Sequence, residues 1–326
     1  MLVANHAIVL NKLGGPEVLE WTEVELEPPG PREIQLRQTY IALNYADIYH
    51  RTGVYPLSLP EVLGVEAAGL VEAVGAEVRD FQIGDRVAYT LAIGAYAQRR
   101  NVPAERAVHL PDDIEDRTAA ALLGKGLTAR YLLRDLHVVR PGEAILVHAA
   151  AGGVGSLMCQ WAAALGATVI GTVSSDAKAE FAQARGCHFP IVLGRGDLAT
   201  EVMKITSGAK VAVAYDSIGQ ATFMASLDCL QPRGLLVYYG ESSGAVGPVP
   251  LEILGPKGSL MVTRPTLAHF MATRQRLVEA ASELFAAVRN KILQPAISQT
   301  YSLQEAAAAH RDLEARRTTG STVFEV

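Results

Sequence analysis

The chain has 326 residues, of which 49% are apolar and 19% are charged, and its formal net charge is −5. This length and composition are typical of about two globular domains, and they exclude a disordered or collagen-like protein. A mildly acidic chain has no overall attraction to nucleic acid or anionic lipid, so neither is an expected partner.

The three cysteines, Cys159, Cys187 and Cys229, are an odd number, and none belongs to a C-x-x-C pair. This pattern argues against a disulfide framework and a four-cysteine zinc site, and favours buried, reduced thiols. The N-terminus has no basic segment followed by a long apolar run, so we expect no secretory signal. No uncharged apolar stretch reaches the roughly 18 residues that would span a bilayer. The sequence therefore predicts a cytoplasmic protein.

The first third of the chain consists of short β-like runs that glycine and proline interrupt. Examples are residues 7–10, 34–37 and 69–75, and their spacing is irregular. Such runs are typical of a mostly β, barrel-like domain. The pattern changes near residue 125, where strand and helix patterns begin to alternate.

These later elements predict a parallel sheet that helices cover on both faces, because the strands are apolar throughout. They are strands at 144–148, 168–171, 211–215 and 235–239, with helices at 154–165, 177–185 and 221–230 between them. A long helix pattern follows at 275–290. The strand–helix–strand pattern at 297–326 could rejoin the first domain.

Residues 148–155 give the strongest local signal for function. They connect a predicted strand to a predicted helix and read A-x-G-x-x-G, with Ala150 in the first glycine position. In this pattern Gly152 lets the backbone approach a pyrophosphate, and Gly155 lets the helix pack close to the strand. The helix N-terminus also attracts phosphate. The segment predicts a dinucleotide site; the alternative is a tight connection without a ligand.

The end of the second strand indicates which dinucleotide binds. NAD sites usually place Asp or Glu there to bind the ribose, but the first acid here is Asp176, at the expected start of the next helix. Ser174 and Ser175 can donate to a 2′-phosphate, and the Lys178 ammonium attracts it. We therefore expect NADPH; the alternative is that Lys178 is an ordinary solvated lysine.

Several motifs resemble a known family. GVEAAGLVEAVG at 64–75 and GDRV at 84–87 resemble the signature of the medium-chain dehydrogenase/reductase superfamily. Four further motifs are similar to its zinc-independent NADPH:quinone oxidoreductase, or zeta-crystallin-like, branch: NYADIY at 44–49, KGLTA at 125–129, YDSIG at 215–219 and GESSG at 240–244. The resemblance runs nearly from end to end.

The resemblance implies an α/β protein with two domains. Residues 1–125 and 266–326 would form a GroES-like, β-rich catalytic domain. Residues 126–265 would form a Rossmann domain, a doubly wound parallel sheet that binds NADPH. The family also implies a homodimer, in which two Rossmann sheets join through the strand at 259–263.

The resemblance also assigns cofactor-binding residues, position by position. Those expected near the nicotinamide are Asn44 and Asp47, with Thr128 as a further cofactor contact. Those expected at the phosphates and adenosine are Gly152, Gly153, Val154, Ser174, Lys178, Ser217, Gly240, Glu241, Ser242 and Ser243. Arg264 and Arg316 match family arginines that contact the cofactor, although both could equally be surface residues. One position departs from the family: Leu193 stands where a tyrosine commonly helps to bind the 2′-phosphate. Arg195 could compensate.

We expect no metal. Zinc-dependent relatives carry His and Cys ligands in the positions that Val65 and Asn44 occupy here. Valine cannot bind zinc, and asparagine is a poor zinc ligand.

Without zinc, Asn44 and three tyrosines are the candidates for orienting an acceptor: Tyr49, Tyr55 and Tyr131. A phenol can donate a hydrogen bond to a carbonyl and stack on a flat ring, although each tyrosine could equally be a packing residue. His50 is more easily explained as a solvated turn residue than as a proton donor, and His148 as a buried histidine with satisfied hydrogen bonds.

Three functions remain open at this point. The first is NADPH-dependent reduction of quinones, which needs no strong general acid because a hydroquinone anion can take its proton from water. The second is reduction of the C=C bond of α,β-unsaturated aldehydes or ketones (enones), which needs a proton donor. The third is an NADPH-binding structural or RNA-binding protein with little turnover.

Overall fold

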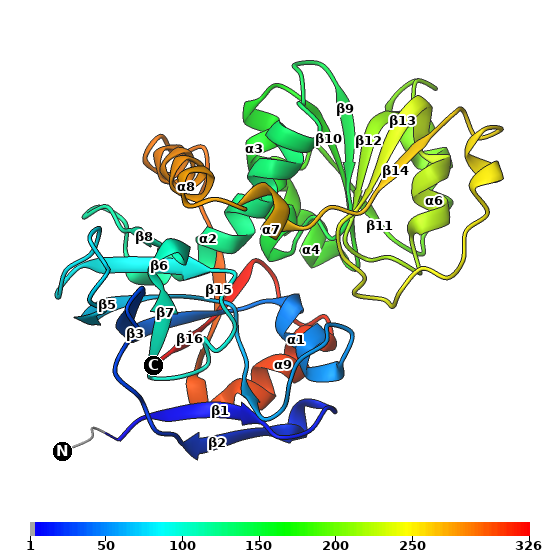
Figure 1. Ribbon diagram of the computed structural model, residues 1–326. Helices are drawn as coiled ribbons and strands as arrows, with labels where there is room; N and C mark the ends of the chain where they lie inside the picture. The colour runs from blue at the N-terminus through cyan, green and yellow to red at the C-terminus, as the bar shows by residue number, and fades with distance from the viewer. Residues whose placement is uncertain (1–3) are drawn as a thin grey trace. The chain divides into compact units, whose positions relative to one another are not determined.

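The chain folds into two units, which Figure 1 shows for a computed structural model that describes residues 4–326. The first unit contains the chain up to Leu127 together with Met271–Ala286 and Pro295–Val326. The second unit contains Thr128–Phe270 and Ala287–Gln294. Residues 287–294, which the sequence analysis assigns to the catalytic domain, therefore group with the second unit.

The first unit is built on a seven-stranded sheet around the long strand β3 (Glu33–Leu43). Ile34, Leu36 and Gln38 are buried and alternate with less buried neighbours, as in a strand with one face on a core. The sheet order is β15 (Ile297–Ser302), β16 (Ser321–Glu325), β3, β5 (Glu66–Val74), β6 (Arg86–Thr90) and β8 (Ala107–His109), and β7 (Arg99–Pro103) also pairs with β3. A smaller sheet has the order β2 (Leu19–Glu23), β1 (His6–Leu10) and β4 (Glu61–Val62).

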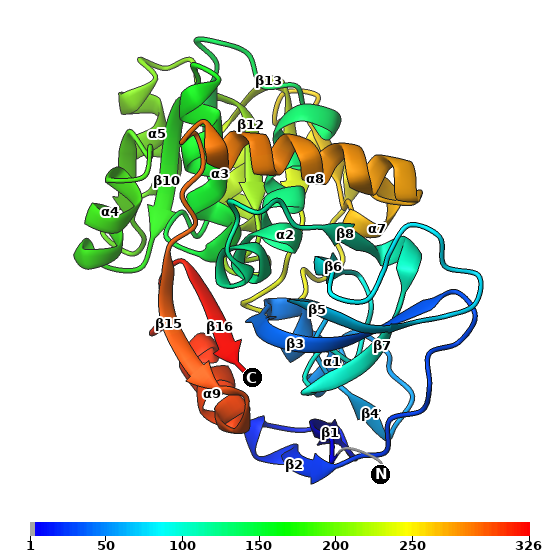
Figure 2. The same ribbon diagram turned by 90° about the vertical axis from the view of Figure 1, so that its left-hand side faces the viewer.

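The C-terminal segment completes this unit. β16 pairs antiparallel with β3 and parallel with β15, and α9 (Ala306–Glu314) lies between β15 and β16 in the chain, as Figure 2 shows. The strand–helix–strand pattern at 297–326 thus returns to the first unit.

Three further helices begin in this unit. They are α1 (Tyr45–Thr52), α2 (Asp116–Tyr131) and α8 (Arg274–Arg289), and short 3-10 turns lie at Pro16–Val18, Ala104–Arg106 and Leu303–Glu305. α1 ends at Gly53, whose φ of 82° is the left-handed conformation that glycine adopts without strain. The sequence pattern predicts a loop turn at His50, but the residue lies in the last turn of this helix.

The second unit is the expected doubly wound parallel sheet. Its order is β11 (Phe189–Val192), β10 (Thr168–Val173), β9 (Ala144–Val147), β12 (Val211–Asp216), β13 (Leu230–Tyr238) and β14 (Met261–Thr263), and every pairing is parallel. Helices lie on either side of it in Figure 1. They are α3 (Gly153–Ala164), α4 (Asp176–Gln183), α5 (Leu198–Ile205) and α6 (Phe223–Asp228), and α7 (Leu267–Phe270) and a 3-10 turn at Leu251–Leu254 follow.

The strand order reverses at β9, because β10 and β11 lie on one side of it and β12 to β14 on the other. Ligands of such sheets bind outside the carboxyl ends of the strands at this point. Within residues 4–326, the structure has no helix with the length and apolar character needed to cross a bilayer.

Candidate functional site

The carboxyl ends of the parallel strands bring together most of the predicted cofactor residues. Val147, at the end of β9, lies opposite both Gly171 of β10 and Tyr215 of β12, and Asp216 lies opposite Tyr238 of β13. The loops that follow these strands therefore start at one edge of the sheet. They carry Gly152, Gly153, Val154, Ser174, Ser217, Gly240, Glu241, Ser242, Ser243 and, after β14, Arg264.

The first of these loops is the glycine-rich turn into α3. A Cβ atom at Gly155 would lie 2.3 Å from the carbonyl oxygen of Ala149, a distance that no side chain tolerates. The prediction that Gly155 permits close packing is therefore confirmed. Gly152 precedes α3 as its N-cap and makes no side-chain cap bond. The first N–H groups of a helix have no carbonyl partner within it, so those at Gly153 and Val154 can point at an anion.

The second loop connects β10 to α4. Ser174 is exposed, and Ser175 caps α4 by accepting the Lys178 N–H at 3.4 Å. The Asp176 carboxylate receives two hydrogen bonds from the Arg195 guanidinium, at 2.6 and 2.7 Å, and this contact lowers the pKa of Asp176. Serine hydroxyls, a lysine and an arginine are thus present around the start of α4.

The loops after β12 and β13 are joined to each other. The Ser242 N–H donates to the Ser217 carbonyl at 3.2 Å, and the Ser243 N–H donates to the Ile218 carbonyl at 2.8 Å. The Ser243 hydroxyl also donates to Ile218 at 2.7 Å and accepts the Ala221 N–H at 3.0 Å. Ser243 therefore connects the two loops, and its hydroxyl is hydrogen-bonded to Ile218 and Ala221.

Glu241 and Arg264 form an ion pair at this edge, with 3.0 Å between carboxylate and guanidinium. Glu241 also accepts the Tyr238 hydroxyl at 2.7 Å, and the Arg264 guanidinium lies 4.2 Å from the centre of the Tyr238 ring. Arg264 neutralises the acid that would otherwise repel a diphosphate here.

Beneath the edge lies a buried hydrogen-bond network that the sequence analysis did not anticipate. The Asp216 carboxylate accepts the N–H groups of Ile218 and Gly219, at 2.8 and 3.0 Å, and hydroxyls of Thr222 and Ser226. The network fixes the start of the loop that carries Ser217.

His148 belongs to the same network. It contacts the Thr172 hydroxyl through Nδ1 and the Ser226 hydroxyl through Nε2, both at 2.8 Å. Because the Ser226 proton faces the acceptors Asp216 and Thr222, Ser226 accepts from His148, and Nε2 carries the proton. Burial lowers the pKa of His148, which keeps the ring neutral. The interpretation of His148 as a satisfied buried residue is confirmed.

In the first unit, Asn44 and Asp47 lie among buried charges. Asp47 is fully buried; its Oδ2 accepts the Asn44 N–H at 2.8 Å, and its Oδ1 has no hydrogen-bond partner within residues 4–326. Burial raises the pKa of Asp47 to about 7. The Asn44 side chain donates to buried Glu66 at 3.1 Å, and the Lys125 Nζ lies 3.6 Å from the same carboxylate oxygen. Burial also raises the pKa of Glu66, and Lys125 opposes that rise.

A chain of hydrogen bonds leads away from Asp47. Arg51 donates to Nδ1 of His310 at 2.9 Å, and because arginine only donates, Nδ1 must accept. Burial and the Arg51 charge lower the pKa of His310 to about 3, so the ring is neutral and its proton is on Nε2. Nε2 then donates to the Tyr96 hydroxyl at 3.0 Å, and Tyr96 donates to Asp47 at 2.9 Å. Every donor in this relay, from Arg51 through His310 and Tyr96, points toward Asp47.

The aromatic candidates of the first unit lie together on α1 and the loop after it. The rings of Tyr49 and Tyr55 meet edge to face, with their centres 5.0 Å apart, and Tyr45 lies 5.3 Å from Tyr49. His50 meets Tyr55 at 5.5 Å. Its Nδ1 is buried without a hydrogen-bond partner within residues 4–326, and burial lowers its pKa. The expectation of a turn is therefore wrong for His50, which is half-buried at the end of α1.

Three predicted residues lie apart from these groups along the chain. Thr128 and Tyr131 share the last turn of α2 and belong to the second unit. The Tyr131 ring stacks on Phe270, with centres 4.3 Å apart, so one of its faces is covered. Arg316 is exposed and follows α9 in the first unit.

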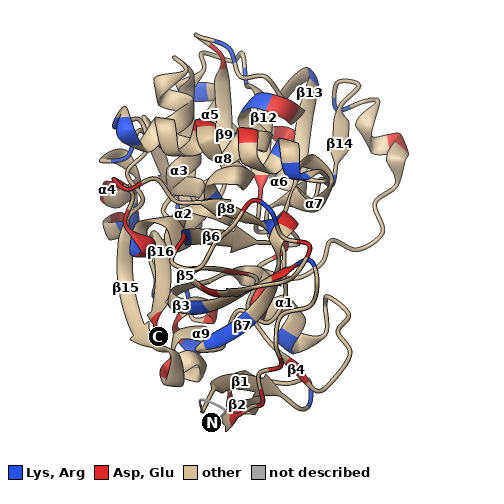
Figure 3. Cartoon of the chain, turned by 60° about the vertical axis from the view of Figure 1, so that its left-hand side comes forward, with Lys and Arg blue, Asp and Glu red and all other residues tan. Residues whose placement is uncertain are grey.

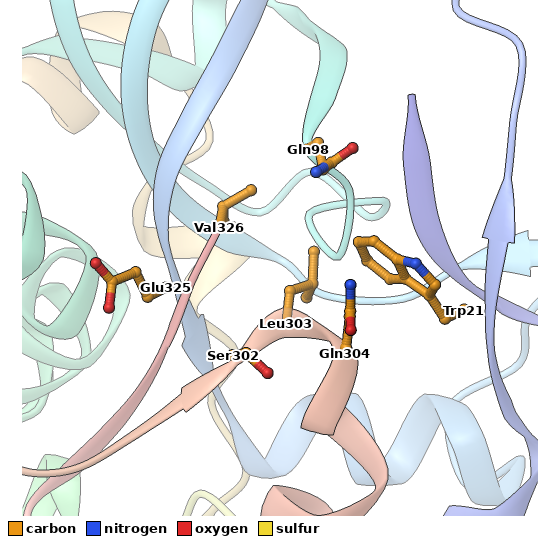
Figure 4. A pocket seen from close by; sticks show the side chains of 7 residues that line it. All are labelled: Trp21, Gln98, Ser302, Leu303, Gln304, Glu325 and Val326. Carbon is orange, nitrogen blue, oxygen red and sulfur yellow. The ribbon is translucent and has the colours of Figure 1, made fainter. Parts of the chain in front are cut away.

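A hollow of the first unit lies elsewhere. It is lined by Trp21, Gln98, Ser302, Leu303, Gln304, Glu325 and Val326, which Figure 4 shows. Among the described residues, Glu325 is the one charged side chain in its lining, and no predicted site residue belongs to that lining. The hollow therefore does not compete with the sites described above.

The sequence patterns do not predict a site role for five ionisable residues that the structure buries: Arg51, Glu66, Lys125, Asp216 and His310. A weak signal was available for two of them. Lys125 interrupts a run of small and apolar residues, and Asp216 directly ends an apolar strand. A charge in such a position is retained only where it is paired.

Comparison with known proteins gives two matching family models. Residues 30–112 match the alcohol dehydrogenase GroES-like domain, and residues 153–287 match a model described as zinc-binding dehydrogenase. Within residues 4–326, the structure contains no group of three or more His, Cys, Asp or Glu side chains that could hold a metal ion.

Individual relatives are similar over nearly the whole chain. A quinone oxidoreductase of Pseudomonas aeruginosa is 51% identical and covers 95% of this chain and 96% of its own length. A 2-haloacrylate reductase of a Burkholderia species is 47% identical, with 98% of both chains covered. The crystal structure of Escherichia coli quinone oxidoreductase complexed with NADPH superposes with a TM-score of 0.97 at 46% identity, covering 98% of this chain and 100% of that one.

Proposed function

Because the chain belongs to the quinone oxidoreductase branch of the medium-chain dehydrogenase/reductase superfamily, we propose that it is an NADPH-dependent quinone reductase. The observation that carries this proposal is the carboxyl edge of the parallel sheet. The glycine turn, the serines of the loops after β10 and β13, and the basic residues Lys178 and Arg195 all lie on segments that start there. A relative with nearly the same fold was crystallised with NADPH, and relatives at 47–51% identity are named quinone oxidoreductases.

The residues at this edge fit the parts of NADPH. The N–H groups at Gly153 and Val154 would bind the pyrophosphate, because they lie at the N-terminus of α3. Gly155 lets this end of the helix lie close to the preceding turn, where a Cβ atom would clash. Ser174 and Lys178 would bind the 2′-phosphate, and Ser217 with the loop 240–243 would border the adenosine and diphosphate. When bound, NADPH supplies a hydride from its nicotinamide ring.

Asn44, Tyr49 and Tyr55 are proposed to orient the acceptor and the nicotinamide. Asn44 is held by Glu66, and the two tyrosine rings hold each other edge to face, so these side chains are ordered before an acceptor arrives. Preordered groups lower the entropy cost of aligning the donor and acceptor carbons. The reduced quinone is a stabilised anion that can take its proton from water. We propose that no zinc takes part, because Asn44 and Val65 occupy the positions of the family's metal ligands.

A second function has support from one relative and one observation. The 2-haloacrylate reductase acts on a compound with a C=C bond, as its name states, and reduction of such a bond needs a proton donor. Asp47, whose pKa is raised to about 7, is a buried carboxyl group that can carry a proton. The third hypothesis, an NADPH-binding structural or RNA-binding protein with little turnover, has less support, since Figure 3 shows both Lys or Arg and Asp or Glu scattered over the described elements.

Steady-state oxidation of NADPH against a panel of quinones and a panel of enones tests the function. We expect a higher kcat/KM for quinones, and a higher kcat/KM for NADPH than for NADH with the same quinone. Turnover confined to enones would move the assignment to the second function. Salt-dependent RNA binding without turnover of either panel would contradict both.

Replacing Tyr49 by phenylalanine tests the acceptor site. The ring would keep its contact with Tyr55, so we expect kcat/KM for quinones to fall by only about 0.5–1.5 kcal/mol, the cost of one hydrogen bond. Tyr49→Ala removes the ring as well and should cost more. If Tyr49 were an essential acid, Tyr49→Phe would instead cost about 10²- to 10⁴-fold. No change in either variant would mean that Tyr49 only packs.

We also propose a cytoplasmic homodimer. β14 pairs with β13 on one side, and Met261 and Val262 of β14 are 53% and 39% exposed. An apolar edge strand invites pairing with a second copy, and this is the edge that the family uses. The three cysteines are free thiols, as is usual in a reducing compartment.

A further inference from the structure

An exposed ion pair lies where the second and third strands of the parallel sheet end. Val173 of β10 is opposite Val192 of β11, so Asp176 and Arg195 come from neighbouring loops. Two parallel hydrogen bonds of 2.6 and 2.7 Å join the guanidinium to the carboxylate, although the side chains are 61% and 68% exposed. A bidentate guanidinium–carboxylate pair has a defined geometry even at the surface, so Arg195 is held against the Asp176 carboxylate.

Asp176 is a charge of the wrong sign for the proposed site. It is the first residue of α4, directly after the capping Ser175 and two residues before Lys178. A carboxylate near the end of the second strand is the feature by which NAD-selective sites bind the ribose hydroxyls. The same carboxylate would repel a 2′-phosphate. Left unpaired, Asp176 would therefore favour NADH over NADPH.

Arg195 changes both the charge of Asp176 and its ability to accept hydrogen bonds from a ribose. Its two terminal nitrogens hold both Asp176 oxygens, which cancels the charge and occupies the atoms that a ribose hydroxyl would need. The remaining N–H groups of these nitrogens still point away from Asp176 and can donate to a phosphate. The Leu193 N–H donates to the Val173 carbonyl at 2.9 Å, which keeps the loop that carries Arg195 beside the end of β10. The Leu193 side chain supplies no polar group.

We propose that Arg195 determines the cofactor preference of this enzyme, by masking Asp176 and by contributing a direct contact to the 2′-phosphate. The proposal rests on the proposed function. This role differs from the one proposed for Lys178, which is only to attract the phosphate.

The test measures the affinity of purified variants for 2′,5′-ADP and 5′-AMP by calorimetry, alongside kcat/KM for NADPH and NADH. For Arg195→Ala we expect affinity for 2′,5′-ADP to fall about 10- to 100-fold, as for loss of a charge-assisted contact. Affinity for 5′-AMP and kcat/KM for NADH should hold or rise, because Asp176 becomes available to the ribose. Lys178→Ala should weaken 2′,5′-ADP binding without any gain for NADH.

The double variant Arg195→Ala/Asp176→Asn separates the two proposed roles of Arg195, which are to mask Asp176 and to contact the 2′-phosphate. It should recover part of the 2′,5′-ADP affinity lost in Arg195→Ala and should lose any gain for NADH. Asp176→Asn alone should bind 2′,5′-ADP at least as tightly as the wild type. Lys204→Ala, which breaks the exposed Lys204–Glu201 pair on α5, is the matched control and should change none of these values.

The outcomes distinguish this proposal from the proposed function. If Arg195→Ala leaves the ratio of the two affinities unchanged while Lys178→Ala lowers it, NADPH remains the cofactor and the role of Arg195 is disproved. If the double variant is no better than Arg195→Ala, masking of Asp176 is disproved. If the wild type reduces quinones with NADH as well as with NADPH and shows no preference for 2′,5′-ADP, the NADPH assignment itself fails.

Discussion

Replacing Arg51 by methionine should lower the free energy of unfolding of the first unit by about 3 kcal/mol. Arg51 is 1% exposed and donates to the Gly14 carbonyl at 3.0 Å, to His310 and to the Glu314 carboxylate at 2.6 Å. Methionine fills a similar volume but supplies no donor, so a carbonyl, a ring nitrogen and a carboxylate lose their partner together. Glu314 can regain water because its side chain is 32% exposed, which keeps the cost near the lower end for a broken buried pair.

Urea unfolding followed by tryptophan fluorescence can measure this loss. The two tryptophans lie in different units, with Trp21 on β2 and Trp161 on α3. In a Trp161→Phe background the emission of Trp21 therefore reports on the first unit alone. Arg32→Met is the matched control: Arg32 forms an ion pair of 2.8 Å with Glu77, but its side chain is 86% exposed, so we expect a small effect. Equal shifts for the two variants would contradict the importance assigned to the buried arginine.

Most of the parallel sheet could be predicted because its signals are local. β9, β10, β12 and the second half of β13 are short, mainly apolar runs that polar residues or turns follow, and burial on both faces of a parallel sheet requires that pattern. The glycine turn could be predicted for the same reason: Gly152 and Gly155 lie three residues apart in one loop. The short strand β11 and the start of β13 at Leu230 could not, because their residues lack a distinctive pattern.

The buried polar groups of the first unit could not be predicted, because their partners are distant in sequence. Arg51 and His310 are separated by 259 residues, and Tyr96 and His310 by 214. No periodicity connects such positions; only the return of the C-terminal segment to β3 brings α9 to this unit. His50 shows a related difficulty. The glycine at position 53 suggested a turn, whereas it marks the end of a helix that includes His50.

The stability of the first unit should fall as the pH rises from about 4 to about 7 because of Asp47. Burial raises the pKa of Asp47 in the folded protein to about 7, from the ordinary value of 3.8. Between these two values the unfolded chain releases the proton while the folded chain keeps it, so deprotonation favours unfolding. The contribution of Asp47 is therefore fully present below about pH 4 and lost as the pH rises through 7. From pH 5 to pH 8 the loss is about 3 kcal/mol.

Asp47→Asn should remove this dependence. Oδ2 of Asp47 receives two donors, so the proton of the neutral acid is on Oδ1, and the asparagine amide reproduces an acceptor and a donor in these places. Relative to the wild type, the variant should gain about 3 kcal/mol in free energy of unfolding between pH 5 and pH 8, as read from Trp21 emission in the Trp161→Phe background. The groups around Asp47, which are Glu66, Tyr96, Lys125 and His310, are the same in both proteins, so their contributions largely cancel in the difference. A constant difference across this range would mean that Asp47 is ionised in the fold. Quinone reduction by the variant then shows which form the enzyme uses: retained kcat/KM indicates the neutral acid, and a large loss indicates the carboxylate.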